Sequence, residues 1–184
     1  MSISRIRHRI LDPFRSDTRG VAAVEFAFIM PIIVALWLGA TELSFAVSTD
    51  RRIARAANGV ADITARLRMV NDDIMDGIFE GGLAMTFPDG QNGEVEIVAS
   101  SIEIDADGGT SVRKSWVTDG GTALTSGAAV DIGDGLAIPG EGGCAIVATA
   151  TLTKPVFLLP KLFGETRTHT HTFAYRTRSG VCLG

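Results

Sequence analysis

The hydrophobic pattern divides the chain into an apolar run, an amphipathic stretch and a region of short alternating segments. From Val21 to Val47 the only strongly polar side chains are Glu25 and Glu42. About 20 mainly apolar residues in a helix suffice to cross the hydrocarbon core of a membrane. The run therefore predicts a transmembrane helix over residues 21–47.

The helical pattern continues past this run. Apolar residues recur three and four positions apart, with arginine and aspartate on the other faces: Ile53, Ala56, Val60, Ile63, Leu67 and Val70. Residues 48–70 are predicted to extend the same helix outside the membrane, with a seam that packs on the body or on neighbouring subunits. A short second helix is expected from Asn71 to Phe79, with Asn71 or Asp72 as its cap and Gly81-Gly82 as its stop.

The rest of the chain has the alternating pattern of apolar and polar residues that is typical of short strands. Residues 94–105 alternate and then shift phase, which predicts a strand with a bulge near Ser100-Ser101. A turn at residues 107–109 leads to a return strand over 111–118, and two further strands are expected over 144–153 and 166–178. Residues 119–143 read as a long irregular connection. The predicted fold class is α+β: a long N-terminal helix followed by a small antiparallel β-sheet body, residues 71–184.

Charge gives this layout a direction. Residues 1–20 carry five arginines and two aspartates, which leaves 12 basic and 19 acidic residues in the remainder. A basic arm beside a membrane helix is the cytoplasmic flank by the positive-inside rule, so the body is expected on the far side. The acidic balance of the body argues against nucleic-acid binding.

Cys144 and Cys182 both fall in the exported body. An oxidising compartment would let them pair, and a disulfide between them is predicted, with two buried thiols as the alternative. No catalytic motif or phosphate-binding loop is recognisable, so neither an enzyme nor a cofactor is expected.

Two possible metal motifs are weak. His169 and His171 lie two apart on one face of a predicted strand, but a metal site needs at least a third ligand, and no other histidine lies on the exported side. We therefore expect their face to pack under the apolar loop that precedes it, and no metal site. Residues 103–108 resemble half of a calcium loop, but the position of its bidentate glutamate is occupied by Lys114, so a hairpin turn is the better interpretation.

Glu25 needs an explanation of its own. A charged side chain costs about 2.5–3.5 kcal/mol at the centre of a membrane helix, less near an end, and calls for a partner. The alternative is that Glu25 merely sits in the headgroup layer, where the N-terminal end of the helix dipole favours it.

The stretch "RGVAAVEFAFIMPIIVALWLGATE" resembles the prepilins and pseudopilins of the type IV pilus group. It is most similar to the TadE-like proteins of the tight-adherence (Flp, type IVb) pilus system. The shared features are a basic leader, Gly20, then Glu25-Phe26 and an apolar helix with Pro31 and Glu42. The resemblance covers about a seventh of the chain, and it implies a type IV pilin-like fold.

This resemblance implies a processing site and a docking role. A prepilin peptidase would cut between Gly20 and Val21, and the new α-amino group of Val21 would pair with Glu25 of the same or a neighbouring subunit. Glu25 and Phe26 would then serve subunit docking. The implied partners are the prepilin peptidase, other pilin and pseudopilin subunits, the Tad inner-membrane assembly platform and the lipid bilayer.

The leading interpretation is a minor pseudopilin that assists assembly or initiation of an adhesive Flp pilus. It would cross the bacterial inner membrane once, with residues 1–20 cytoplasmic and the body periplasmic, or enter the extracellular pilus. A second interpretation is a signal-anchored envelope binding protein that keeps its leader. A third is a soluble exported domain cleaved after Ser48, since Ala46-Val47-Ser48 offers small residues after an apolar stretch.

Overall fold

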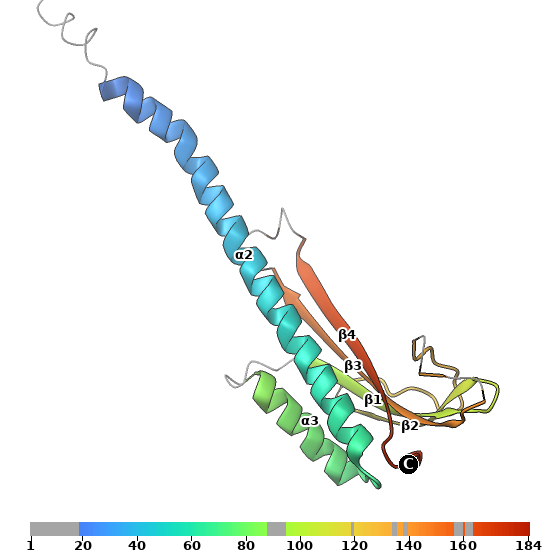
Figure 1. Ribbon diagram of the computed structural model, residues 1–184. Helices are drawn as coiled ribbons and strands as arrows, with labels where there is room; N and C mark the ends of the chain where they lie inside the picture. Colours follow the sequence, from blue (N-terminus) through green and yellow to red (C-terminus); the bar gives the residue numbers. More distant parts are fainter. Residues whose placement is uncertain are drawn as a thin grey trace, which may run out of the picture. The chain divides into compact units, whose positions relative to one another are not determined.

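A computed structural model describes residues 19–87, 95–118, 120–133, 136–137, 140–156, 160 and 164–184. Residues 1–18 of the predicted leader, and most of the apolar loop before the last strand, lie outside this described part. The chain divides into two units, Met1–Leu43 and Ser44–Gly184. The elements in chain order are α2 (Arg19–Arg66), α3 (Asp72–Thr86), β1 (Val95–Ile104), β2 (Thr110–Val117), β3 (Gly143–Pro155) and β4 (Thr166–Arg176) (Figure 1).

Helix α2 joins the predicted membrane segment and its extension in one continuous element that contains Pro31. It ends at Arg66, before the predicted end at Val70. There the Leu67 N–H donates to the carbonyl of Thr64 at 3.1 Å, and the Arg178 N–H donates to the carbonyl of Ala65 at 3.0 Å. A tight turn and the C-terminal segment thus satisfy carbonyls that the last turn of a helix leaves free.

The buried face of α2 differs from the predicted seam. Ile53, Ala56 and Val60 are buried as expected, but Ile63 is 42% exposed. The face continues instead through other small residues: Ala57, Ala61, Thr64 and Ala65. A straight helix has 3.6 residues per turn, so a seam that repeats every 3.5 residues drifts away from the surface it contacts.

Helix α3 confirms Asn71 as its N-cap, because the side chain of Asn71 accepts from the Ile74 N–H at 2.9 Å. Gly81-Gly82 does not stop the helix, which continues to Thr86. A Cβ atom added to Gly82 would lie 3.0 Å from the Cγ2 atom of Val60. Glycine is therefore used here for close approach of α3 to α2, a contact that compensates its low helix propensity.

All four predicted strands are present and form an antiparallel sheet in the order β2-β1-β3-β4. The register between β1 and β2 shifts at Ser101/Ile102, which confirms the predicted bulge. The hairpin turn also forms, since Asp105 accepts from the backbone N–H groups of Asp107 and Gly109. Residues 120–133, 136–137 and 140–142 of the predicted connection contain neither helix nor strand.

The sheet separates two apolar clusters. The larger lies between one sheet face and the helices; its members include Ile53, Val60, Met75, Ile97 and Leu152. The smaller contains Ile102, Ile104, Val112, Ile132 and Val147, so part of the irregular connection covers the end of the other face. A long N-terminal apolar helix with a small antiparallel sheet confirms the α+β class and is consistent with a type IV pilin-like layout.

Candidate assembly surface on the N-terminal helix

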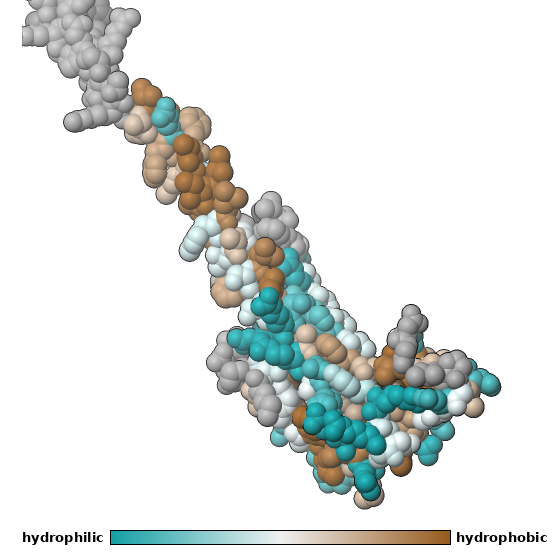
Figure 2. All heavy atoms as spheres, in the orientation of Figure 1, coloured by the Kyte–Doolittle hydropathy of each residue, from teal (hydrophilic) through white to brown (hydrophobic). Residues whose placement is uncertain are grey.

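The N-terminal part of α2 presents an apolar surface. Its large side chains are exposed, among them Phe28 at 74%, Leu36 at 69% and Trp37 at 67% (Figure 2). Apolar surface in water costs about 25 cal/mol per Å², so a surface of this kind calls for lipid or another helix. By length and composition α2 is able to cross a membrane, and one such helix near the N-terminus fits a single-pass anchor.

The predicted processing and docking residues all lie on the first turns of this helix. Because α2 begins at Arg19, the bond between Gly20 and Val21 lies within its first turn. Val21 and Glu25 are one turn apart, which places both side chains on the same side of the helix. Glu25 is exposed, as is Phe26 at 63%. The structure therefore brings Val21 and Glu25 together within one chain through the helical repeat alone.

Residues 20–62 match the family model of TadE-like proteins. The match confirms the predicted resemblance and spans Glu25, Phe26 and Pro31 as well as Asp50, while the sheet body lies outside it. No curated protein and no solved structure was found to match the chain. The similarity to TadE-like proteins thus rests on residues 20–62, which lie within α2.

Helix α2 is hydrogen-bonded to β4 through Asp50, a residue that the sequence pattern did not single out. Asp50 Oδ1 lies 3.2 Å from Nδ1 of His169 and 3.0 Å from Nε2 of His171. A carboxylate only accepts hydrogen bonds, so each ring nitrogen that faces it carries the proton. The hydrogen bond from His171, followed by that from His169, lowers the pKa of Asp50 below 3.8.

This cluster shows which residue the two histidines contact. Both histidines contact Asp50 of α2, and His169 is nearly buried there. The apolar loop that was expected to cover this face lies mostly outside the described residues. The alternation of side chains along a strand predicted that both rings lie on one face. It could not predict their partner, because the Asp50 carboxylate lies 119 positions before His169 in the chain. Within the described ranges, no group of three or more histidine, cysteine, aspartate or glutamate side chains has the arrangement of a metal site.

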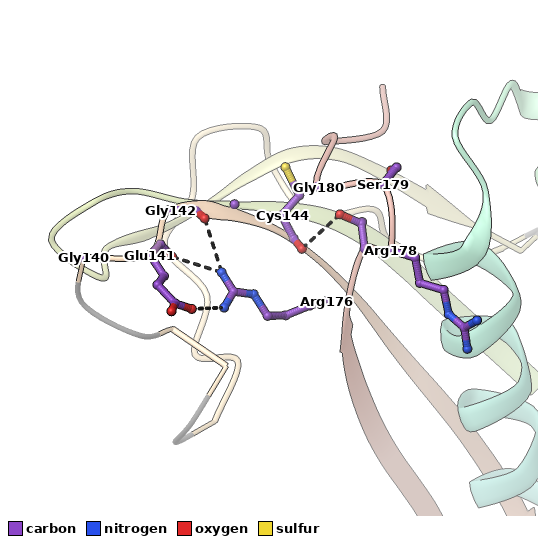
Figure 3. A pocket seen from close by; sticks show the side chains of 10 residues that line it. Gly140, Glu141, Gly142, Cys144, Arg176, Arg178, Ser179 and Gly180 are labelled. Carbon is purple, nitrogen blue, oxygen red and sulfur yellow. Dashed lines mark hydrogen bonds and ion pairs between the residues drawn. The ribbon is translucent and has the colours of Figure 1, made fainter.

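The predicted disulfide joins Cys144 to Cys182, whose Cα atoms are 5.1 Å apart. Beside it lies an open depression of about 690 Å³ (Figure 3). The Arg176 guanidinium enters it and donates to the carboxylate of Glu141 at 3.2 Å and to the carbonyls of Glu141 and Gly142. Figure 3 shows the Arg178 side chain pointing away from Arg176. These hydrogen bonds connect Glu141 and Gly142, which precede β3, to Arg176 of β4.

Proposed function

We propose that the protein is a minor pseudopilin that assists assembly or initiation of a Tad-type adhesive pilus. The family match associates the chain with Tad pilus systems in general. The observation that carries the finer proposal is the placement of Glu25 one turn after Val21 on the exposed and mainly apolar N-terminal part of α2. In this proposal the protein acts by assembly and not by catalysis.

Processing after Gly20 would give the helix its second charge. The new α-amino group of Val21 is cationic at neutral pH and attracts a carboxylate strongly where water is excluded. Pairing with Glu25 of a neighbouring subunit would fix the stagger of two helices, while their apolar faces, Phe26 included, supply packing area. Such a step needs the prepilin peptidase, other pilin subunits and the inner-membrane assembly platform as partners, with the sheet body periplasmic.

Two other interpretations predict different N-termini. A signal-anchored binding protein keeps Met1, and a soluble exported domain begins at Thr49. α2 runs through Ser48 without interruption to Arg66, and the two compact units of the chain meet nearby, between Leu43 and Ser44. A cut after Ser48 would separate the anchor from a helix whose Ile53, Ala56 and Val60 belong to the core of the body.

The test is the intact mass of the protein purified from membranes that contain a prepilin peptidase. We expect Val21 as the first residue, and we expect Gly20→Leu to retain the leader. Met1 as the N-terminus of the unaltered protein would refute the processing step.

A second measurement addresses docking after processing. Glu25→Gln should be cleaved normally but should reduce incorporation into pilus assemblies, whereas Glu25→Asp keeps the charge and should retain a larger share. Equal incorporation of the Gln variant and the unaltered chain would remove the docking role while leaving the processing step intact.

A further inference from the structure

Five basic side chains lie at one end of the sheet body, just past the apolar run of α2. Three arginines are on α2, a lysine is at the end of β3, and an arginine is at the start of β4. We name this set the basic collar: Arg51, Arg52, Arg55, Lys154 and Arg167. All five belong to the compact unit Ser44–Gly184, so their arrangement is described within that unit alone.

Two of these cations face each other across the sheet. Lys154 of β3 and Arg167 of β4 are direct partners in the antiparallel register. Side chains of such partners lie on the same face of the sheet with their Cβ atoms about 5 Å apart, and like charges in this position destabilise the pair. An anion that contacts both side chains would remove this repulsion.

The ring of Phe87 connects this pair to α2. Phe87 is buried, and the Lys154 Nζ lies 5.8 Å from its ring centroid. The Arg52 Cζ lies 6.0 Å from the same centroid, so both cations are in the range of a cation–π contact. Positive charges from α2, β3 and β4 therefore meet at this end of the body.

The collar continues around the helix. Arg51 and Arg55 are one turn apart, and the Arg55 Nε donates to the carbonyl of Arg51 at 3.2 Å. Both side chains are exposed, whereas Ile53 and Ala56 of the same turns are buried. The planar guanidinium group matches the geometry of phosphate oxygens, so exposed arginines of this kind suit phosphate groups that approach from solvent.

The positive charge of the collar is not paired within the described part of the chain. None of its five members makes an ion pair there. Asp50 already accepts from two histidines, and Glu165 precedes β4. Five cations and these two carboxylates leave an excess of three positive charges. The excess is still two when the charged residues of the adjoining undescribed stretches are counted as well: Asp89, Glu94 and Lys161.

The remainder of the chain past residue 20 has the opposite sign. Residues 21–184 contain 12 basic and 19 acidic residues, so seven basic and 17 acidic residues remain outside the collar and its two carboxylates. A protein with this asymmetry is attracted to an anionic surface at its basic end and repelled elsewhere. The collar therefore fits an anionic partner.

The position of the collar along α2 distinguishes among anionic partners. The last residues of the apolar run, 44–47, belong to the same compact unit, and Arg51 follows Val47 by four helical residues, or about 6 Å. The headgroup layer extends about 5–7 Å beyond each side of the hydrocarbon core. Arg51 thus reaches lipid phosphates when the apolar run spans that core. A free phosphate ion or an acidic protein accounts for the charge of the collar but not for this position.

We propose that the basic collar binds the headgroups of anionic phospholipids in the leaflet next to the sheet body. Lysine and arginine beside a membrane helix attract anionic lipids, and the lipid phosphates supply the anion that the opposed Lys154 and Arg167 need. The contact holds the body against the membrane. This inference rests on the single-pass anchor and goes beyond the proposed pilus role, because it requires neither cleavage after Gly20 nor docking by Glu25.

The test uses the full chain in nanodiscs of phosphatidylcholine with an increasing fraction of phosphatidylglycerol. NMR of the arginine Nε groups reports each site separately, so binding by the basic residues 1–20 does not obscure the collar. We expect the Nε resonances of Arg52 and Arg167 to shift in a saturable way. Arg68 is exposed and lies 17 positions after Arg51, so its resonance should stay unchanged.

A charge reversal tests the opposed pair. Lys154→Glu places a carboxylate across from Arg167, so an internal ion pair should replace the lipid contact. The phosphatidylglycerol fraction that gives half of the Arg52 shift should rise by about tenfold or more, or saturation should be lost. Arg68→Glu, the matched control, makes the same change in net charge and should stay within about twofold of the parent.

The unaltered chain keeps the test decisive if the charge reversal prevents folding. Shifts confined to the arginines of residues 1–20 would overturn the proposal, as would an unchanged Arg52 response in folded Lys154→Glu. Equal shifts of Arg52 and Arg167 on addition of inorganic phosphate to purely phosphatidylcholine nanodiscs would overturn the choice of a lipid in favour of a small anion.

Discussion

The disulfide between Cys144 and Cys182 closes a loop with a sequence separation of 38. In the chain-entropy model a loop of this length restricts the unfolded chain enough to stabilise the folded state by about 4 kcal/mol. We therefore expect the double variant Cys144→Ser/Cys182→Ser to lose about 3–4 kcal/mol of unfolding free energy. Its denaturant m-value should rise, because an unfolded chain without the cross-link exposes more surface.

Urea unfolding of the detergent-solubilised chain can measure this loss through tryptophan fluorescence. The chain has two tryptophans. Trp37 is 67% exposed on the apolar helix, whereas Trp116 is 6% exposed in the body and donates from Nε1 to Asp72 at 3.0 Å. A Trp37→Phe background leaves Trp116 as the single reporter of the body.

Packing at the C-terminus has to be separated from the cross-link. Leu183 is 2% exposed, and its N–H donates to the Ser101 hydroxyl at 3.0 Å. Leu183→Ala with the disulfide intact should cost about 2–4 kcal/mol with an unchanged m-value, which is the signature of a cavity. A loss under about 1 kcal/mol in the serine double variant would refute the reasoning, because the cross-link would then not restrict the unfolded chain as its loop length predicts.

Two further predictions test other contacts by chemical denaturation. Gly81→Ala should stabilise the folded chain by about 0.8–1 kcal/mol, because a Cβ atom added there meets nothing within 4 Å. Gly82→Ala should not show this gain, because its Cβ atom would lie 3.0 Å from the side chain of Val60. Equal effects of the two variants would contradict the close packing of α3 on α2. The pKa of Asp50 is lower in the folded protein than its ordinary value of 3.8. The ionised carboxylate therefore stabilises the folded state above pH 3.8, and this contribution is lost as the pH falls through the pKa of the folded state. The difference in unfolding free energy between the parent and Asp50→Asn should thus shrink below pH 3.8. A difference that stays constant down to pH 2 would exclude the histidine contacts as its source.

Much of the fold could be predicted because it depends on local patterns. The apolar run, the Asn71 cap, the bulge near Ser100-Ser101 and the four strands each leave a signal within a few residues, and all four features are present. The family resemblance rested on one such stretch, and the matched segment covers it from Gly20 onward. The errors lie where a local rule competes with packing, as at Gly81-Gly82, where a helix stop was expected and a close helix contact formed.

The candidate sites divide in the same way. Gly20, Val21 and Glu25 could be placed from the sequence because a helix fixes neighbours one turn apart. The partner of the two histidines could not, because Asp50 lies 121 positions before His171 and no local period connects them.

By itself the sequence determined an apolar helix with one carboxylate near its start, a body of short strands and two cysteines able to pair. Only the tertiary structure decided which face of α2 is buried, which carboxylate meets the histidines and which cations face each other across the sheet. Periodicity records the repeat of one element and carries no information about its neighbour. The order and register of the strands arise only when the whole sheet packs, and they place Lys154 opposite Arg167.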